Sequence, residues 1–246
     1  MNDAKGRPFP NKGAGDAEGI ALNGDLAFVS FEGNHRVLAY DIGRCGAAAR
    51  GAPLGWSLTK AFARNKLTVG GNQGVEALAV TPDWMLFAGI ETKVGKTSPL
   101  SARPVERAPD FNLTMGENAP EIVGLDLLAA ADDSRAVRAF SLHRSTSPLA
   151  SNAITVMETD FERYLDQANL PARVVSEADE RSHARFKPTS VRTLAQMNVL
   201  LTIDNFEGIA ARQLPDGRVR LFIVSDDNFS ARQRTLLMVF DVAKRG

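Results

Sequence analysis

The chain has 246 residues, and its 29 basic and 29 acidic side chains leave no net charge at pH 7. No basic excess is available to neutralise phosphates, so the composition indicates no nucleic-acid partner. A single cysteine excludes an internal disulfide and a cysteine metal cluster, and the three histidines lack the HExxH spacing of a zinc hydrolase.

The first 14 residues are polar and contain Gly and Pro, which predicts a flexible segment. They include no apolar h-region, so no signal peptide is expected. No run of about 18 apolar residues predicts a membrane span. The length suits one large domain or two small ones, and a single domain over residues 1–246 is expected.

Short segments rich in β-branched and aromatic residues follow, separated by turn signals such as Asn23-Gly24 and Pro215-Asp216-Gly217. The predicted strands are Leu26–Glu32, Val37–Ile42, Met85–Glu91, Ala136–Leu142, Ile154–Thr159, Val219–Ser225 and Leu236–Val242. One helix is predicted at Glu158–Ala168, because apolar residues recur there at i, i+3, i+4 and i+7. The edge of a blade is the alternative for this segment. The polar stretch Ala178–Pro188 predicts a loop.

Three of these hairpins repeat one pattern. "EGIALNGDLAFVSFE" begins at Glu18, "EALAVTPDWMLFAGIE" at Glu76, and "EGIAARQLPDGRVRLFIVSDD" at Glu207. Antiparallel units that recur at roughly 40 to 60 residues are typical of β-propeller blades. The pattern therefore predicts an all-β propeller with blades of three or four antiparallel strands. A β-sandwich is the alternative, although it needs no recurrent Glu.

Acidic side chains stand at the open end of each repeat. In a propeller the first strand of each blade lines the channel, so Glu18, Glu76 and Glu207 are expected to converge on one mouth. With the turn centred on Asp216-Gly217, Glu207 is predicted to face Asp226 across the hairpin. Converging oxygens suit a hard cation such as Ca²⁺, so these four residues are the predicted metal ligands. Alternatively, each Glu braces the neighbouring blade.

The second strand of each repeat carries a central phenylalanine. Phe28, Phe87 and Phe222 are expected to be buried between blades.

The sequence also resembles a known family. "DNFEGIA" (Asp204–Ala210) followed by "SDDNFSARQRTLL" (Ser225–Leu237) is similar to the C-terminal blade of the phytase-like family, described as having esterase-like activity of phytase. "GDAEGIALNGDLAFVSFEGNHRVLAYDI" (Gly15–Ile42) and "NQGVEALAV" (Asn72–Val80) resemble its inner blades. The similarity covers residues 15–92 and 200–243, whereas 93–199 matches poorly apart from "ITVMETDFER".

This resemblance implies a β-propeller and hydrolysis of a phosphate or other ester, assisted by Ca²⁺. Relatives are often exported bacterial proteins with an export signal and a blade before the first repeat. Neither precedes Gly15 in this chain, so an incomplete ring, truncated at the N-terminus, is expected. The alternative function is a non-catalytic propeller that binds a small ligand or a protein partner at the channel mouth.

Ester hydrolysis needs further groups around the cation. The catalytic candidates are Asp226, Asp227 and His35, and the candidates for binding substrate are Arg36, Arg232 and Arg234. Each arginine follows an acidic residue on the same loop, so a surface ion pair is the alternative for each. No GxSxG motif surrounds any serine, which argues against serine-esterase chemistry.

Overall fold

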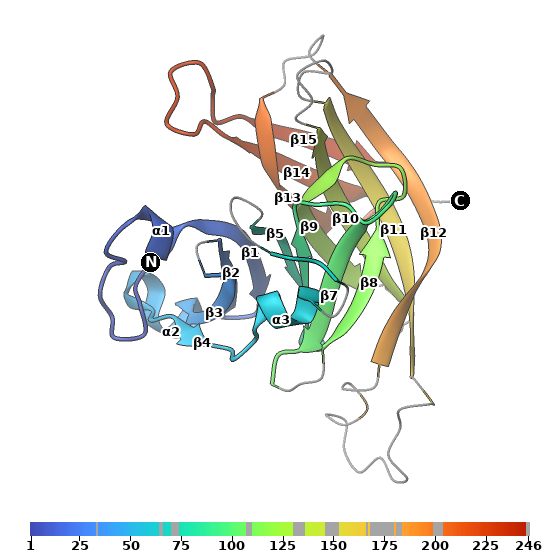
Figure 1. Cartoon of the computed structure of the whole chain (residues 1–246). Helices are drawn as coiled ribbons and strands as arrows, with labels where there is room; N and C mark the ends of the chain where they lie inside the picture. The colour runs from blue at the N-terminus through green and yellow to red at the C-terminus, as the bar shows by residue number, and fades with distance from the viewer. Residues whose placement is uncertain are drawn as a thin grey trace.

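The computed structural model describes residues 1–32, 34–63, 66–69, 74–106, 110–129, 136–145, 153–165, 167, 180, 184–198 and 204–244. Its strands form four antiparallel sheets that follow one another along the chain, and strands adjacent in sequence are adjacent in each sheet. The sheets are the blades of a four-bladed β-propeller arrangement (Figure 1). The predicted all-β propeller is confirmed.

Each blade begins with an inner strand and runs outward. Blade 1 contains β1 (Ala17–Asn23), β2 (Leu26–Phe31), β3 (Arg36–Asp41) and β4 (Ala52–Pro53). Blade 2 contains β5 (Val75–Val80), β6 (Met85–Ile90), β7 (Ser98–Pro104) and β8 (Phe111–Met115). Blade 3 contains β9 (Glu121–Ala129), β10 (Ala136–Ser145), β11 (Ala153–Leu165) and β12 (Ala184–Met197). Blade 4 has three strands, β13 (Asn205–Gln213), β14 (Val219–Asp226) and β15 (Leu237–Val242).

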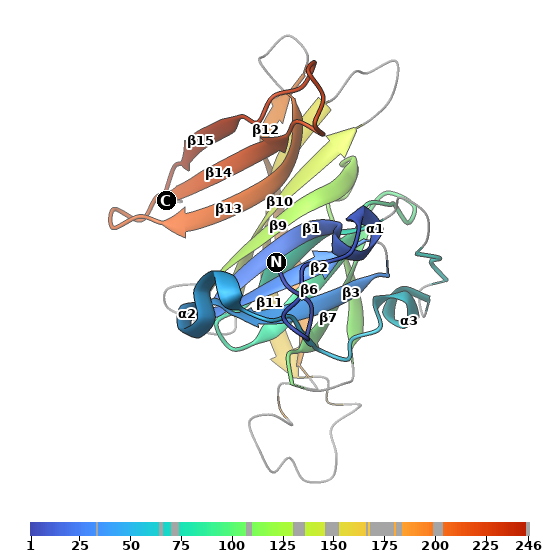
Figure 2. The same cartoon turned by 90° about the vertical axis from the view of Figure 1, so that its left-hand side faces the viewer.

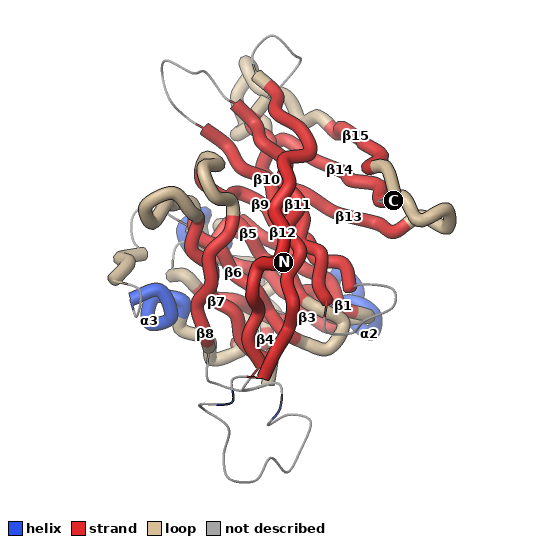
Figure 3. The backbone as a smooth tube through the Cα atoms, turned by 90° about the vertical axis from the view of Figure 1, so that its right-hand side faces the viewer, coloured by secondary structure: helices blue, strands red, loops and turns tan. Residues whose placement is uncertain are grey.

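Helices in the described part of the chain are short and peripheral (Figure 3). They are α1 (Lys12–Gly15), α2 (Ile42–Cys45), the 3-10 helix η1 (Gly46–Ala48) and α3 (Leu58–Ala63). None of them is long and apolar enough to cross a membrane. The segment before β1 lies against blade 1, because Asn2 bridges Arg50 and Phe9 packs on Phe31.

The helix predicted at Glu158–Ala168 is wrong within the described residues. Positions 158–165 belong to β11, which pairs with β10 on one side and β12 on the other. Backbone hydrogen bonds to a strand on each side stabilise an extended conformation here, despite the helical spacing of the apolar residues. The apolar face of the predicted helix is not formed, because Tyr164 and Leu165 are exposed. Residues 184–188 of the predicted loop form the start of β12. Its remaining residues, apart from Glu180, lie outside the described part of the chain.

The core lies between consecutive blades. Phe28 and Phe87 are fully buried as predicted, whereas Phe222 is only half-buried. Close approach of the inner strands explains two glycines: a Cβ on Gly19 or on Gly124 would lie 2.7 Å from a backbone oxygen of the next blade. Phe222 lies on the face of blade 4 against which no such blade packs.

Blades 1 and 4 are separated by an open seam. Inner strands β1, β5, β9 and β13 pack in that order, but β13 and β1, both described in full, neither pair nor pack along their lengths. A cleft of about 670 Å³, called the seam cleft, lies between them. Figure 2 shows the sheet of blade 4 above the sheet of blade 1. Ile20 on β1 and Val224 on β14 line the cleft and are exposed.

Candidate functional site

A β-bulge interrupts every inner strand at the same place. In blade 2 the register shifts between Val75 and Ala77, which leaves Glu76 without a partner on β6. In blade 4 the same shift leaves Glu207 unpaired. In blade 1 the irregularity spans Glu18 and Gly19, and in blade 3 it falls at Val123. Because a bulge re-aims its side chain, the repeat turns three Glu side chains toward a common region.

On the second strand of each blade, the residue that follows the pair preceding the bulge belongs to a further set. These positions are Glu32, Glu91, Arg144 and Asp226 in blades 1 to 4. Blade 3 thus contributes an arginine where the other blades contribute acids. The charge of Glu207 raises the pKa of both Glu18 and Glu76, so Glu207 lies within electrostatic reach of both.

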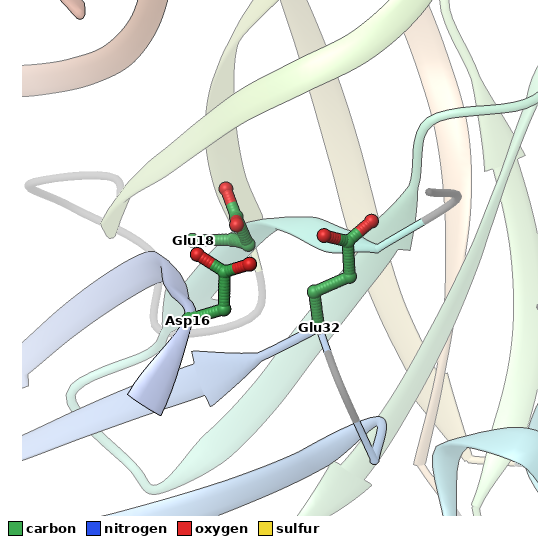
Figure 4. Close-up of side chains that lie close together, drawn as sticks. All are labelled: Asp16, Glu18 and Glu32. Carbon is green, nitrogen blue, oxygen red and sulfur yellow. The ribbon is translucent and has the colours of Figure 1, made fainter. Parts of the chain in front are cut away.

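Three carboxylates of blade 1 form the acid cluster: Asp16, Glu18 and Glu32. Each offers an oxygen atom, and these atoms lie within 4.8 Å of one another. Asp16 precedes β1, Glu18 lies in its bulge, and Glu32 follows β2, so a single hairpin brings them together (Figure 4). Burial raises the pKa of Glu18 to about 7, and the neighbouring carboxylates add to this rise. Burial likewise raises the pKa of Glu32.

An ion-pair network lies beside this cluster. Arg144 donates from Nη1 to Oε1 of Glu207 at 2.6 Å and from Nη2 to Oε1 of Glu91 at 2.9 Å. Burial, followed by the charge of Glu91 and a hydrogen bond to it, raises the pKa of Glu76 well above its usual range. Glu76 therefore keeps its proton at neutral pH and can donate a hydrogen bond to Glu91. Arg144 balances the acids of blades 2 and 4.

The acid cluster lacks comparable compensation. Its one ion pair among the described residues joins Lys12 Nζ to Asp16 at 3.7 Å, and the Lys12 side chain is mostly exposed. Such a pair in contact with water contributes little. Carboxylate oxygens are the donors that Ca²⁺ prefers, and a bound cation would offset the burial and the repulsion between carboxylates that raise the pKa of Glu18. The donor set thus fits a hard divalent cation.

Comparison with known proteins agrees with the fold and the repeated motifs. A family model described as "Phytase-like: Esterase-like activity of phytase" matches residues 1–229. The chain belongs to this family. The match includes residues 93–199, most of which the quoted motifs do not cover. No curated protein matches this phytase-like chain.

A solved structure of Kuenenia stuttgartiensis hydrazine synthase is similar to this phytase-like chain at 13% sequence identity and a TM-score of 0.39. The similarity covers 92% of this chain and 62% of that one, so the phytase-like chain spans less than two thirds of it.

The predicted pairing of Glu207 with Asp226 is wrong. Asp226 faces Asn205, because the bulge adds a residue at Glu207 and the turn is centred on Asp216. Asp226 is exposed and accepts a hydrogen bond from the Asn228 backbone. Asp227 likewise accepts from the Phe229 backbone, so both acids shape the loop after β14. Asp226 still lines the seam cleft.

The other predicted site residues occupy different places. Arg36 lies over the Phe31 ring with its guanidinium carbon 4.3 Å from the centroid. His35 is half-buried in a left-handed conformation with φ of 43°, and burial lowers its pKa. Arg232 and Arg234 are exposed on the loop before β15, and Arg234 Nε lies 3.6 Å from Asp204.

Four residues of the site are absent from the predicted site residues: Asp16, Glu32, Glu91 and Arg144. Asp16 and Glu32 stand within the first repeat, at the two ends of its hairpin. Arg144 lies in the divergent middle, where Val123 replaces the recurrent Glu. When "IVGLDLL" (Ile122–Leu128) is aligned with the three repeats, Arg144 takes the position that Glu32 and Glu91 have in blades 1 and 2.

Proposed function

We propose that this phytase-like chain carries out metal-assisted hydrolysis of a phosphate or other ester beside the seam cleft. The observation that supports this most is the acid cluster, in which three carboxylate oxygens lie within 4.8 Å of one another. Family membership over residues 1–229 supports the same class of reaction. The seam cleft, of about 670 Å³, has the size of a site for a small substrate.

The proposal assigns Ca²⁺ to Asp16, Glu18 and Glu32. A bound cation supplies positive charge that polarises an ester oxygen and stabilises the negative charge developing during hydrolysis. Glu18, whose pKa is raised to about 7, must lose its proton to ligate the ion, so Ca²⁺ binding is expected to release a proton near neutral pH. Arg144 holds Glu207 and Glu91, and this ion pairing fixes the acidic wall against which a substrate would lie.

The remaining candidates keep proposed roles around the cleft. Arg232 and Arg234 extend from the loop that also carries Phe229 and Thr235, which line the seam cleft. Their exposure leaves both side chains able to reach an anionic substrate group. Asp226 lines the same cleft and is a proposed acid–base or ligand residue. Asp227 and His35 stay proposals as acid–base groups and Arg36 as a ligand-binding group, although none of the three lines the seam cleft.

Calorimetric titration with CaCl₂ tests the metal site. The wild type is expected to bind one ion, and Glu18→Gln and Glu32→Gln are expected to weaken binding at least about tenfold, because each removes a charged ligand. Glu121→Gln, in β9 and outside the cluster, is the matched control and should bind Ca²⁺ normally. Equal binding by all variants would place the ion elsewhere.

Activity is tested separately with p-nitrophenyl phosphate and p-nitrophenyl acetate. Hydrolysis is expected with Ca²⁺, loss with a chelator, and loss in Glu18→Gln and Glu32→Gln. Calcium binding without hydrolysis of these or a wider ester panel would favour the second candidate, a non-catalytic binding propeller. That candidate is supported by the apolar lining of the cleft, where Phe229 and Ile20 are strongly exposed.

A further inference from the structure

A second cleft lies on the outer side of blade 1. It has a volume of about 480 Å³ and is bounded by the N-terminal segment, β3 and residues 51–57. None of its lining residues lines the seam cleft. Phe9, Leu38 and Trp56 supply apolar walls. Arg103, which does not line the cleft, contacts the buried Trp56 ring with its guanidinium carbon 5.7 Å from the ring centroid. We call this the blade 1 cleft.

Arg36 gives this cleft an unbalanced positive charge. Its guanidinium donates to the Ala14 carbonyl and to Asn34, and it stacks on Phe31 and Phe9. Among the described residues, no carboxylate forms an ion pair with it. These contacts use two of the five N–H groups of an arginine. Asp3, which also lines the cleft, is already paired with Arg7 at 2.9 Å.

We propose that the blade 1 cleft binds a small amphiphilic carboxylate, with its carboxylate on Arg36 and its apolar body against Trp56 and Leu38. A guanidinium recognises a carboxylate through directed hydrogen bonds that become stronger in a partly desolvated site. One cation matches one negative charge, whereas a phosphate dianion would stay half-neutralised. The apolar walls favour a hydrocarbon chain or ring as the rest of the ligand.

This inference does not rest on the proposed hydrolysis, because the two clefts have different linings. Hexanoate is a suitable probe, and Trp56 is a built-in reporter. Since the chain has two tryptophans, Trp84→Phe leaves Trp56 as the only indole. Titration of Trp84→Phe with hexanoate at pH 7 is expected to change the Trp56 emission and to saturate. Hexanamide, the neutral isostere, is expected to bind at least about tenfold more weakly.

Arg36→Met in the same background is expected to weaken hexanoate binding at least about tenfold, because it removes the cation but keeps an apolar stem. Arg44→Met, at an exposed arginine in α2 outside the cleft, is the matched control and should leave binding unchanged. Equal affinity for hexanoate and hexanamide would overturn the proposal, as would an unsaturable response. The amide comparison decides the matter even if Arg36→Met fails to fold.

Discussion

Glu18 is half-buried beside like charges, and among the described residues no strong cation balances them, so its ionised form is disfavoured in the folded state. Its pKa is raised from 4.5 to about 7 when folded, so the folded state holds a proton in this range that the unfolded state has lost. The free energy of unfolding therefore falls as pH rises from about 4.5 to about 7. Above about pH 7, ionised Glu18 destabilises the folded state to its full extent.

Glu18→Gln is expected to remove this cost in calcium-free buffer. Allowing for solvent screening of a side chain that is partly exposed, the variant should gain roughly 1–2 kcal/mol at pH 8 and little at pH 4.5. Urea unfolding at both pH values measures the difference. Glu121→Gln, in β9 and outside the cluster, is the control. A gain that is equal at both pH values would show that the charge of Glu18 is not the cause.

His143 acts in the opposite direction. Burial lowers its pKa to about 4, and its ring lies between the Pro120 carbonyl at 3.0 Å and Ser141 Oγ at 2.9 Å. Between pH 6.5 and 4 the unfolded state binds a proton that the folded state does not, so stability falls as pH is lowered.

In His143→Gln, the fall in the free energy of unfolding between pH 6.5 and 4 is expected to be smaller by up to roughly 3 kcal/mol. The variant is also less stable at every pH, because it loses the packing of the ring. The readout is the slope of the urea midpoint between pH 6.5 and 4, with His35→Gln for comparison because His35 is less buried. An unchanged slope would contradict the assignment.

At the scale of single elements, the inner strands carry the repeat most clearly. Gly19 and Gly124 each face a backbone oxygen of the following blade, whereas a Cβ on the equivalent Gly208 meets only the Val224 side chain. Gly19→Ala and Gly124→Ala are thus expected to destabilise by roughly 1–3 kcal/mol through overpacking, and Gly208→Ala by less. Thermal unfolding of the three variants under one condition checks the order. A larger loss for Gly208→Ala would mean that another blade covers its face.

Strands and their turns could be predicted because alternation and turn residues are local signals. The acid cluster could be predicted only in part. Glu18 was identified from its repeat, but the bulge that re-aims it adds one residue, and a simple hairpin count therefore misplaced Glu207. The partner of Glu207 is Arg144, 63 positions away in sequence. Contacts between blades carry no local signal, so no pattern within one hairpin could identify this arginine.

At the scale of the whole molecule, Phe222, Val224 and Leu237 share the face of blade 4 that turns toward the seam, and Ile20 lies on the opposite side of it. In a closed ring every blade is held by two neighbours. Here blades 2 and 3 have two neighbours each, whereas blades 1 and 4 have one.

Because the seam is open, the blades form a linear array with two end blades. An end blade unfolds locally more easily than a blade of a closed ring, because it has one neighbour instead of two. Backbone amides of β1 to β3 and of β13 to β15 are expected to exchange with solvent through partial opening, while those of β6 and β10 need global unfolding. Hydrogen exchange followed by mass spectrometry would show two exchanging ends around a protected centre. Uniform protection across the four blades would mean that the seam closes in solution. Because β1 carries Glu18, calcium bound there would slow exchange at one end of the array first.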